Sequence, residues 1–133
     1  MPDTPENQQA YPQSRSQKPG VGFPIMRWVA IIGLATGVVL DSAFGPWRGK
    51  QTGESALLRE LLKSLRPGDV VVADRYYCSY WMIALLLAHG VDVVFRQHQL
   101  RKTDFRRGRR LGRNDHLVTW NKPQRPAWMD QVT

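Results

Sequence analysis

Asp74 is the residue whose type and position best fit a catalytic or metal-binding role. It follows the apolar run Asp69-Val-Val-Val-Ala, which predicts a strand buried on both faces, as in a parallel sheet. The carboxyl ends of such strands are where ligands bind in open α/β sheets. A carboxylate there can hold Mg²⁺ together with phosphate oxygens. The alternative is structural, with Asp74 capping the following helix or pairing with Arg75, and one carboxylate alone does not make a two-metal site.

Two other patterns suggest metal or phosphate chemistry, but each is weaker. Asp41 ends an apolar run, and a turn aspartate explains it better than a metal ligand does. The loop over residues 45–52 lies between a predicted strand and a predicted helix, as a phosphate-binding P-loop would. It has three residues rather than four between its glycines, and Gln51 rather than Ser or Thr follows Lys50. We therefore assign no nucleotide site to this loop.

The histidines and the cysteine indicate no further reactive site. His89, His98 and His116 lack metal-ligand spacing, so we expect surface or helix-end roles for them. The single cysteine, Cys78, excludes a disulfide framework and a zinc site built from several cysteines.

A basic segment is the strongest functional feature that the residues show by themselves. The formal charge of the chain is +8, and residues 96–125 hold ten of the 19 Lys and Arg but two of the 11 Asp and Glu, so the rest of the chain is neutral. Arginine forms bidentate contacts with phosphate, and counterion release favours such contacts. We therefore expect nucleic acid as the partner rather than an anionic membrane, although a solvated charged loop is the alternative. The predicted DNA-binding residues are Arg96, Arg101, Lys102, Arg106, Arg107, Arg109, Arg110 and Arg113.

Composition and hydropathy limit the class of protein. With 42% hydrophobic residues the chain is globular rather than fully disordered. The N-terminus lacks the basic and apolar regions of a signal peptide. The most apolar run, residues 28–40, is shorter than the roughly 20 residues of a membrane-spanning helix. We therefore expect a soluble, cytoplasmic protein.

The elements that must position Asp74 follow the order β-β-α-β-α-β, which predicts a mixed α/β sheet with helices crossing over it. Val- and Ile-rich runs punctuated by glycine predict a hairpin. Leucines at helical spacing predict a helix that Thr52 caps. The predicted elements cover residues 26–33, 37–41, 52–65, 69–74, 79–88 and 91–96.

We divide the chain into three segments. Residues 1–20 are polar and contain four prolines, so we expect an extended arm without helix. Residues 21–96 form the α/β core, and residues 97–133 are basic and Pro-rich, with strand character only at residues 117–120.

Several motifs in combination resemble the DDE transposases of the insertion-sequence-four type. They are the run Gly68-Asp-Val-Val-Val-Ala-Asp-Arg-Tyr-Tyr77, the preceding loop Gly49-Lys-Gln-Thr-Gly-Glu54, and the later His116-Leu-Val-Thr-Trp120. The resemblance covers essentially the whole chain. It implies an RNase H-like fold, of which this chain carries a partial core and the basic start of a β-rich insertion.

The resemblance also implies a function. In that family two aspartates and a glutamate hold two Mg²⁺ ions, with Mn²⁺ as a possible substitute, for DNA cleavage and strand transfer in transposition. Asp74 matches the second aspartate and would be both catalytic and metal-binding, while Arg75 and Tyr76 match the neighbours that support it. DNA, as transposon ends and target, is the implied partner.

This sequence departs from the family pattern at the other two carboxylates. The first aspartate belongs to an Asp-Gly-Thr-like motif that has no match here, and Asp3 is not its equivalent. The glutamate belongs to a Tyr-Arg-Glu-Lys signature that is also absent. We therefore expect a transposase truncated at both ends and inactive alone.

There are two alternatives. One is a non-catalytic DNA-binding protein that uses the Arg-rich segment, residues 96–113. The other is a nonfunctional relic of an insertion element. The sequence does not specify the DNA repeat recognised or the oligomeric state.

Overall fold

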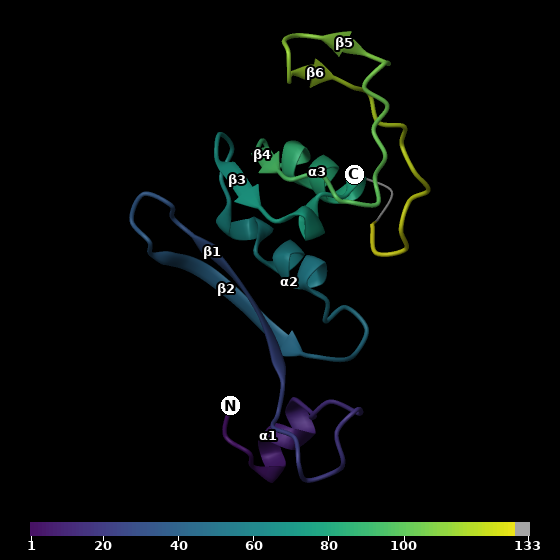
Figure 1. Ribbon diagram of the computed structural model, residues 1–133. Coiled ribbons are helices and arrows are strands. Elements are labelled where there is room, and N and C mark those ends of the chain that lie inside the picture. The colour runs from purple at the N-terminus through teal and green to yellow at the C-terminus, as the bar shows by residue number, and fades with distance from the viewer. Residues whose placement is uncertain (130–133) are drawn as a thin grey trace. The chain divides into compact units, whose positions relative to one another are not determined.

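The structure is a computed structural model that describes residues 1–129 (Figure 1). The chain separates into two compact units, Met1–Leu65 and Arg66–Thr133. The three segments expected from the sequence, with boundaries at residues 20/21 and 96/97, do not coincide with these two units and stay a prediction. Residues 130–133, at the end of the third segment, lie outside the described residues.

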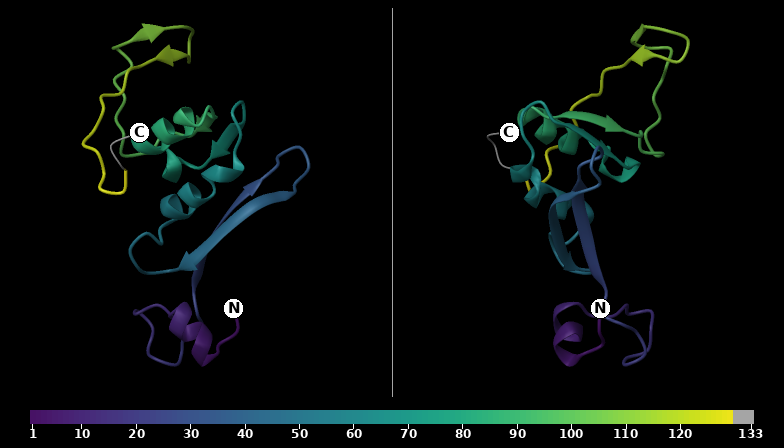
Figure 2. Two further views of the ribbon diagram at one scale, coloured as in Figure 1. Left: turned by 180° about the vertical axis from the view of Figure 1, so that it is seen from behind. Right: turned by 90° about the vertical axis from the view of Figure 1, so that its left-hand side faces the viewer.

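The first unit contains a long antiparallel hairpin of strands β1 (Met26–Ile32) and β2 (Val39–Pro46), seen as a two-stranded ribbon in Figures 1 and 2. Its turn depends on Gly37, whose φ of 70° is unfavourable for other residues. The amide of Gly37 donates to the carbonyl of Gly33 at 2.7 Å. The predicted hairpin is therefore confirmed, although β2 continues well past Asp41.

Helix α2 (Glu54–Glu60) and the 3-10 turn η1 (Leu62–Ser64) cover one face of this hairpin. Four of the five leucines of the predicted stripe are buried together with Ala56, whereas the fifth, Leu65, is half-buried. The buried leucines are Leu57, Leu58, Leu61 and Leu62. The predicted cap is wrong, because Gly53 occupies the N-cap position without a side-chain bond. The hydroxyl of Thr52 instead donates to the carbonyl of Gly49 at 3.1 Å.

The other face of the hairpin is apolar and exposed. Trp28 pairs across the strands with Phe44, and both side chains are 59% exposed. Val29 and Ala43, the neighbouring pair on the opposite face, are buried. This alternation follows from the two-residue period of a strand, and it leaves one face covered by α2 and the other open within residues 1–65.

The N-terminal segment contains a short helix, α1 (Pro5–Ala10), so the expectation of a helix-free arm is wrong. Pro5 begins the helix, where its missing N–H removes no helical bond. The hydroxyl of Thr4 accepts a hydrogen bond from the backbone N–H of Asn7 at 3.2 Å. None of the helical side chains is buried, so capping rather than packing stabilises α1.

The second unit is organised around two parallel strands, β3 (Val70–Ala73) and β4 (Asp92–Phe95), joined through helix α3 (Tyr80–Ala88). Figures 1 and 2 show α3 beside this strand pair. The hydroxyl of Ser79 accepts from the backbone N–H of Met82 at 3.2 Å and caps the helix, as its predicted start at Ser79 implies. Both strands and the helix between them are confirmed.

The prediction that β3 is buried on both faces is wrong. Leu86 of α3 and Val91 before β4 are fully buried. Val70 and Val72 on β3 are each 57% exposed, and Val94 on β4 is 58% exposed. The reason is that α3 covers one face of the strand pair, while no described residue of this unit covers the other.

The strands of the described residues form three separate two-stranded sheets, β1–β2, β3–β4 and β5–β6. The mixed α/β class is therefore shown, but the single sheet with the predicted order is not confirmed. No helix within residues 1–129 is long and apolar enough to cross a membrane.

Candidate active-site carboxylate and nucleic-acid interface

Asp74 lies directly after β3, at the carboxyl end of the parallel strand pair. It is exposed and forms the N-cap of the 3-10 turn η2 (Arg75–Tyr77). Its Oδ1 atom accepts a hydrogen bond from the backbone N–H of Arg75 at 2.5 Å. Asp74 therefore caps this 3-10 turn rather than the following helix, which Ser79 caps, and its exposed carboxylate stays accessible to a ligand.

Arg75 connects the two carboxyl ends of the strand pair. The last register pair of the ladder is Ala73 with Phe95, so the segments after β3 and β4 leave at the same edge. The guanidinium of Arg75 donates to Oε1 of Gln99 at 2.8 Å across this edge. This bond links the turn that carries Asp74 to the segment after β4, and a supporting role for Arg75 stays a prediction.

Tyr76 lies next to Asp74 in the chain but remains largely at the surface. Its side chain is 51% exposed, and its ring meets Tyr77 edge to face at a centroid distance of 5.6 Å. The three predicted site residues are thus brought together by the turn itself, and a supporting role for Tyr76 stays a prediction.

The residues around Asp74 do not fit a two-metal centre. Within residues 1–129 no three His, Cys, Asp or Glu side chains converge to hold a metal ion. A two-metal site requires several carboxylates. We therefore derive no metal-dependent step from the residues of this chain.

Asp41 has a structural role in the first unit. Its Oδ2 accepts a hydrogen bond from the Ser64 hydroxyl, and its Oδ1 accepts from the Ser42 backbone N–H at 2.7 Å. The bond from Ser64 and then that from Ser42 hold the pKa of Asp41 below its usual value, with a smaller contribution from the charge of Lys63. Asp41 therefore ties β2 to η1.

The loop at residues 45–52 is held by interactions of its own side chains and of β1. The Arg27 guanidinium lies 4.4 Å from the centroid of the Trp47 ring, and one of its NH groups donates to the carbonyl of Thr52 at 3.3 Å. The sequence does not identify Arg27 as a residue that stabilises this loop, because nothing in the pattern of its strand distinguishes it from an exposed arginine.

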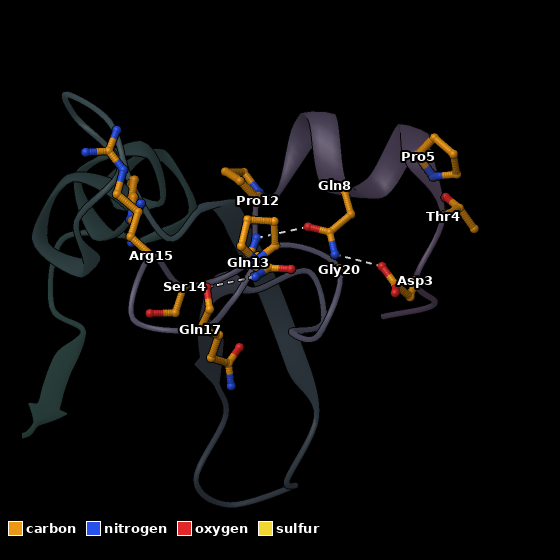
Figure 3. Close-up of a pocket in the computed structure, with 12 residues that line it drawn as sticks. Asp3, Thr4, Pro5, Gln8, Pro12, Gln13, Ser14, Arg15, Gln17 and Gly20 are labelled. Atoms are coloured by element: carbon orange, nitrogen blue, oxygen red, sulfur yellow. Dashed lines mark hydrogen bonds between the residues drawn. The ribbon is translucent and has the colours of Figure 1, made fainter.

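A cavity of about 1,000 Å³ lies beside α1 and the segment that follows it (Figure 3). Its amide side chains already bond within the segment. Gln8 donates to Oδ1 of Asp3 at 2.7 Å, and the backbone N–H of Gln13 donates to Oε1 of Gln8 at 3.0 Å. The lining offers hydrogen bonds but no group of residues suited to nucleophilic or acid–base catalysis.

The three histidines have local structural contacts. Nδ1 of His89 lies 3.0 Å from the carbonyl oxygen of Leu85 at the end of α3. Nδ1 of His98 accepts from the backbone N–H of Leu100 at 3.2 Å. Nε2 of His116 bonds the carbonyl of Arg107. The expected surface and helix-end roles are confirmed.

The end of the Arg-rich segment and the residues after it form a small antiparallel hairpin. Its strands are β5 (Arg109–Arg110) and β6 (His116–Leu117). Gly108 is required before β5, because a Cβ atom there would overlap the carbonyl oxygen of Leu117 and its φ is 88°. The ring of Phe105 meets His116 edge to face at 6.0 Å. These contacts give the basic segment a defined shape.

Most of the predicted DNA-binding side chains point into solvent. The side chains of Arg106 and Arg107 are 91% and 89% exposed. Both lie near Asp104, whose pKa is held below its usual value by the hydrogen bonds from Arg106. Arg101 differs because it is half-buried. The exposed members of the set are Arg96, Lys102, Arg106, Arg107, Arg109, Arg110 and Arg113.

The class of protein follows from comparison with known families. The family model described as Transposase DDE domain matches residues 2–129, so the chain belongs to the DDE transposase family. That family implies an RNase H-like fold, with which the mixed α/β structure agrees.

A curated relative identifies the type of transposase. The chain is 29% identical over 121 residues to the transposase InsG for insertion sequence element IS4 of Escherichia coli strain K12. The match covers 88% of this chain and 26% of the relative, so the chain spans about a quarter of that protein. The predicted resemblance to insertion-sequence-four transposases is confirmed. No solved structure matches the chain.

The bond between Asp41 and Ser64 predicts a pH-dependent contribution to stability. Because the folded-state pKa of Asp41 is depressed, its contribution is present above the unfolded pKa of about 3.9 and is lost as the pH falls through the folded value. Asp41→Asn and Ser64→Ala should each lower the free energy of unfolding at pH 7. Denaturant unfolding of both variants and of the double variant should show coupling at pH 7 that weakens progressively as the pH is lowered below the unfolded pKa of about 3.9. A coupling that does not change with pH would contradict this role.

Proposed function

We propose that this chain acts in DNA transposition, with Asp74 as a catalytic carboxylate and the Arg-rich segment as a DNA-contacting surface. One observation carries the proposal. In a chain of the DDE transposase family, Asp74 lies exposed at the carboxyl end of the parallel strand pair β3–β4. This edge is where α/β sheets bind their ligands.

Asp74 would provide one ligand for a divalent cation, Mg²⁺ or alternatively Mn²⁺. Magnesium is commonly held by one or two carboxylates together with phosphate oxygens of the substrate. Arg75 would keep the turn in place through its bond to Gln99, and Tyr76 would flank the carboxylate. The remaining carboxylates of a two-metal site would come from elsewhere, so we expect no cleavage by this chain alone.

The Arg-rich segment would bind the DNA backbone. Its exposed guanidinium groups suit phosphate oxygens, and its loop and hairpin present them on a small, shaped surface. Such contacts are largely independent of sequence. They would hold DNA without specifying which terminal repeat is recognised.

A second candidate function is a non-catalytic DNA-binding protein, which could compete with a complete transposase for its DNA. The observation that favours it is that no group of metal-ligating side chains converges within residues 1–129. Both functions include DNA binding, and they differ in whether Asp74 takes part in chemistry.

DNA binding predicts a strong dependence on salt. If about six phosphates are contacted, log K should fall with log salt at a slope of roughly −5. The triple variant Arg109→Gln, Arg110→Gln, Arg113→Gln should reduce the steepness by about 3. Fluorescence anisotropy with labelled duplex DNA measures both slopes.

The control for this titration is Arg66→Gln, which removes an exposed arginine outside the predicted set. It should keep the slope close to that of the wild type. Binding without salt dependence, or an equal effect of the control and the triple variant, would contradict the proposed DNA surface.

The single carboxylate predicts that the chain alone does not cut DNA. Supercoiled plasmid incubated with the chain and Mg²⁺ or Mn²⁺ should stay at the level of nicking seen with metal only. The same preparation must bind DNA in the salt titration, so that inactivity cannot be attributed to unfolded protein. Nicking that Asp74→Asn abolishes and Asp92→Asn retains would show that the site is complete and would contradict this expectation.

A further inference from the structure

The face of the β1–β2 hairpin that points away from α2 is apolar along its length, and we call it the open hairpin face. Successive side chains of a strand point to opposite faces, so every second register pair belongs to it. Its four pairs are Met26–Pro46, Trp28–Phe44, Ala30–Ser42 and Ile32–Val39. The large apolar side chains among them are exposed, namely Met26, Trp28, Ile32, Val39 and Phe44.

No charged side chain belongs to the open hairpin face. Arg27 and Asp41 alternate to the opposite face, where both make hydrogen bonds with other parts of the first unit. The chain carries a formal charge of +8, so the charged surfaces of two copies repel each other. The open hairpin face is therefore a surface on which two copies can meet without opposing like charges.

The exposed face of β3–β4 is less suited to such a contact. Val70 pairs there with Asp92, so a carboxylate lies on the same face as the exposed valines. Two copies that met through this face would bring their carboxylates into an apolar interface, and burying an unpaired charge is costly.

The open hairpin face also alternates between large and small side chains. Two bulky pairs flank one small pair, in the order Trp28–Phe44, Ala30–Ser42 and Ile32–Val39. The small pair therefore forms a depression between two ridges. Facing layers interdigitate when large residues lie opposite small ones. A two-fold axis places the same patch on both partners, so the aromatic ridge of each copy can fill the depression of the other.

The area of this face suffices for a weak dimer. Trp28 and Phe44 are each 59% exposed, and an aromatic side chain can bury about 150–250 Å², so the pair offers roughly 250 Å². The exposed aliphatic side chains of the face roughly double this value. Two copies would then bury about 1,000 Å² in total, which is near the lower limit for a specific interface.

We propose that the open hairpin face is an interface between two copies of this chain, with Trp28 of each copy packed over Ala30 and Ser42 of the other. The two hairpins would pack face to face at about 10 Å, as sheets do in sandwiches. Each hairpin is covered by α2 on one side and would gain a cover on the other. The proposal depends neither on DNA binding nor on a catalytic role for Asp74.

Sedimentation velocity of the full chain, freed of nucleic acid, tests for the dimer between about 1 and about 200 μM. The weight-average mass should rise from 15.2 kDa toward twice that value and stop there, because a two-fold interface closes at the dimer. A constant mass of one chain, or growth beyond the dimer, would overturn the proposal.

NMR of the Trp28 indole N–H separates a second copy from another occupant of the face. The signal should shift with protein concentration and lose its accessibility to a soluble paramagnetic agent as the dimer forms. Equal protection of Trp28 at the lowest concentration, in a monomer, would show that another part of the same chain covers the face, and the proposal would be wrong.

A charge placed on the face provides the first variant. Phe44→Lys sets two like charges close together in the dimer, so it should lower the association constant by at least about tenfold. The matched control is Phe105→Lys, which makes the same change at an exposed aromatic residue of the second unit and should associate like the wild type. Circular dichroism checks that both are folded. An equal loss in both variants, or no loss in Phe44→Lys, would rule out this interface.

A larger side chain in the depression distinguishes shape from general hydrophobicity. Ala30→Phe adds apolar area but fills the space that Trp28 of the other copy would occupy, so it should weaken the dimer. Stronger association of Ala30→Phe would indicate unspecific contact between apolar surfaces and would overturn the packing proposed here.

Discussion

The arrangement of the second unit depends on the parallel pairing of β3 with β4. Two parallel strands cannot be joined by a tight turn, so the chain must cross over between them. Helix α3 makes this connection and packs against β4, and Leu86 of the helix and Val91 before β4 are fully buried. The pairing places the ends of both strands at one edge. Asp74 is at that edge because of this constraint, and Arg75 links it to the segment that follows β4.

In the first unit, the strands are antiparallel and are covered in a different way. Its antiparallel hairpin is covered by leucines from α2 and η1, and the Asp41–Ser64 bond ties β2 to η1. Both units leave an apolar strand face exposed, marked by Trp28 and Phe44 in the first and by Val72 and Val94 in the second. Strands of this composition are usually covered on both faces in α/β proteins.

The elements that the sequence predicts correctly are those whose signals are local. Val and Ile runs punctuated by glycine predict the hairpin, and Ser79 before an apolar run predicts the start of α3. The wrong predictions concern residues that can adopt more than one local interaction or conformation. Thr52 can cap a helix, but its hydroxyl bonds Gly49 instead. Proline-rich composition suggested an extended arm, but Pro5 occupies the one helical position that it favours.

In the candidate site, too, the features that depend on neighbouring residues could be predicted, whereas those that depend on distant residues could not. Asp74 and its neighbours could be assigned from a motif, because a short turn after a strand keeps consecutive residues together. The burial of β3 could not be predicted, because an apolar run does not reveal whether another element covers its second face. The difference between Arg101 and the exposed arginines was also invisible, because it depends on Trp120, which lies 19 positions later in the chain.

The central claim of the proposed function is that Asp74 would provide one metal ligand at the carboxyl edge of β3–β4, with the other carboxylates coming from elsewhere. Paramagnetic line broadening by Mn²⁺ in the DNA-bound chain tests it most directly. Broadening should be centred on the backbone amides of residues 73–76 and should disappear in Asp74→Asn. It should persist in Asp92→Asn, because Asp92 pairs with Val70 at the opposite end of the strand pair. Equal broadening in both variants, or none near Asp74, would contradict a metal-binding role for this carboxylate.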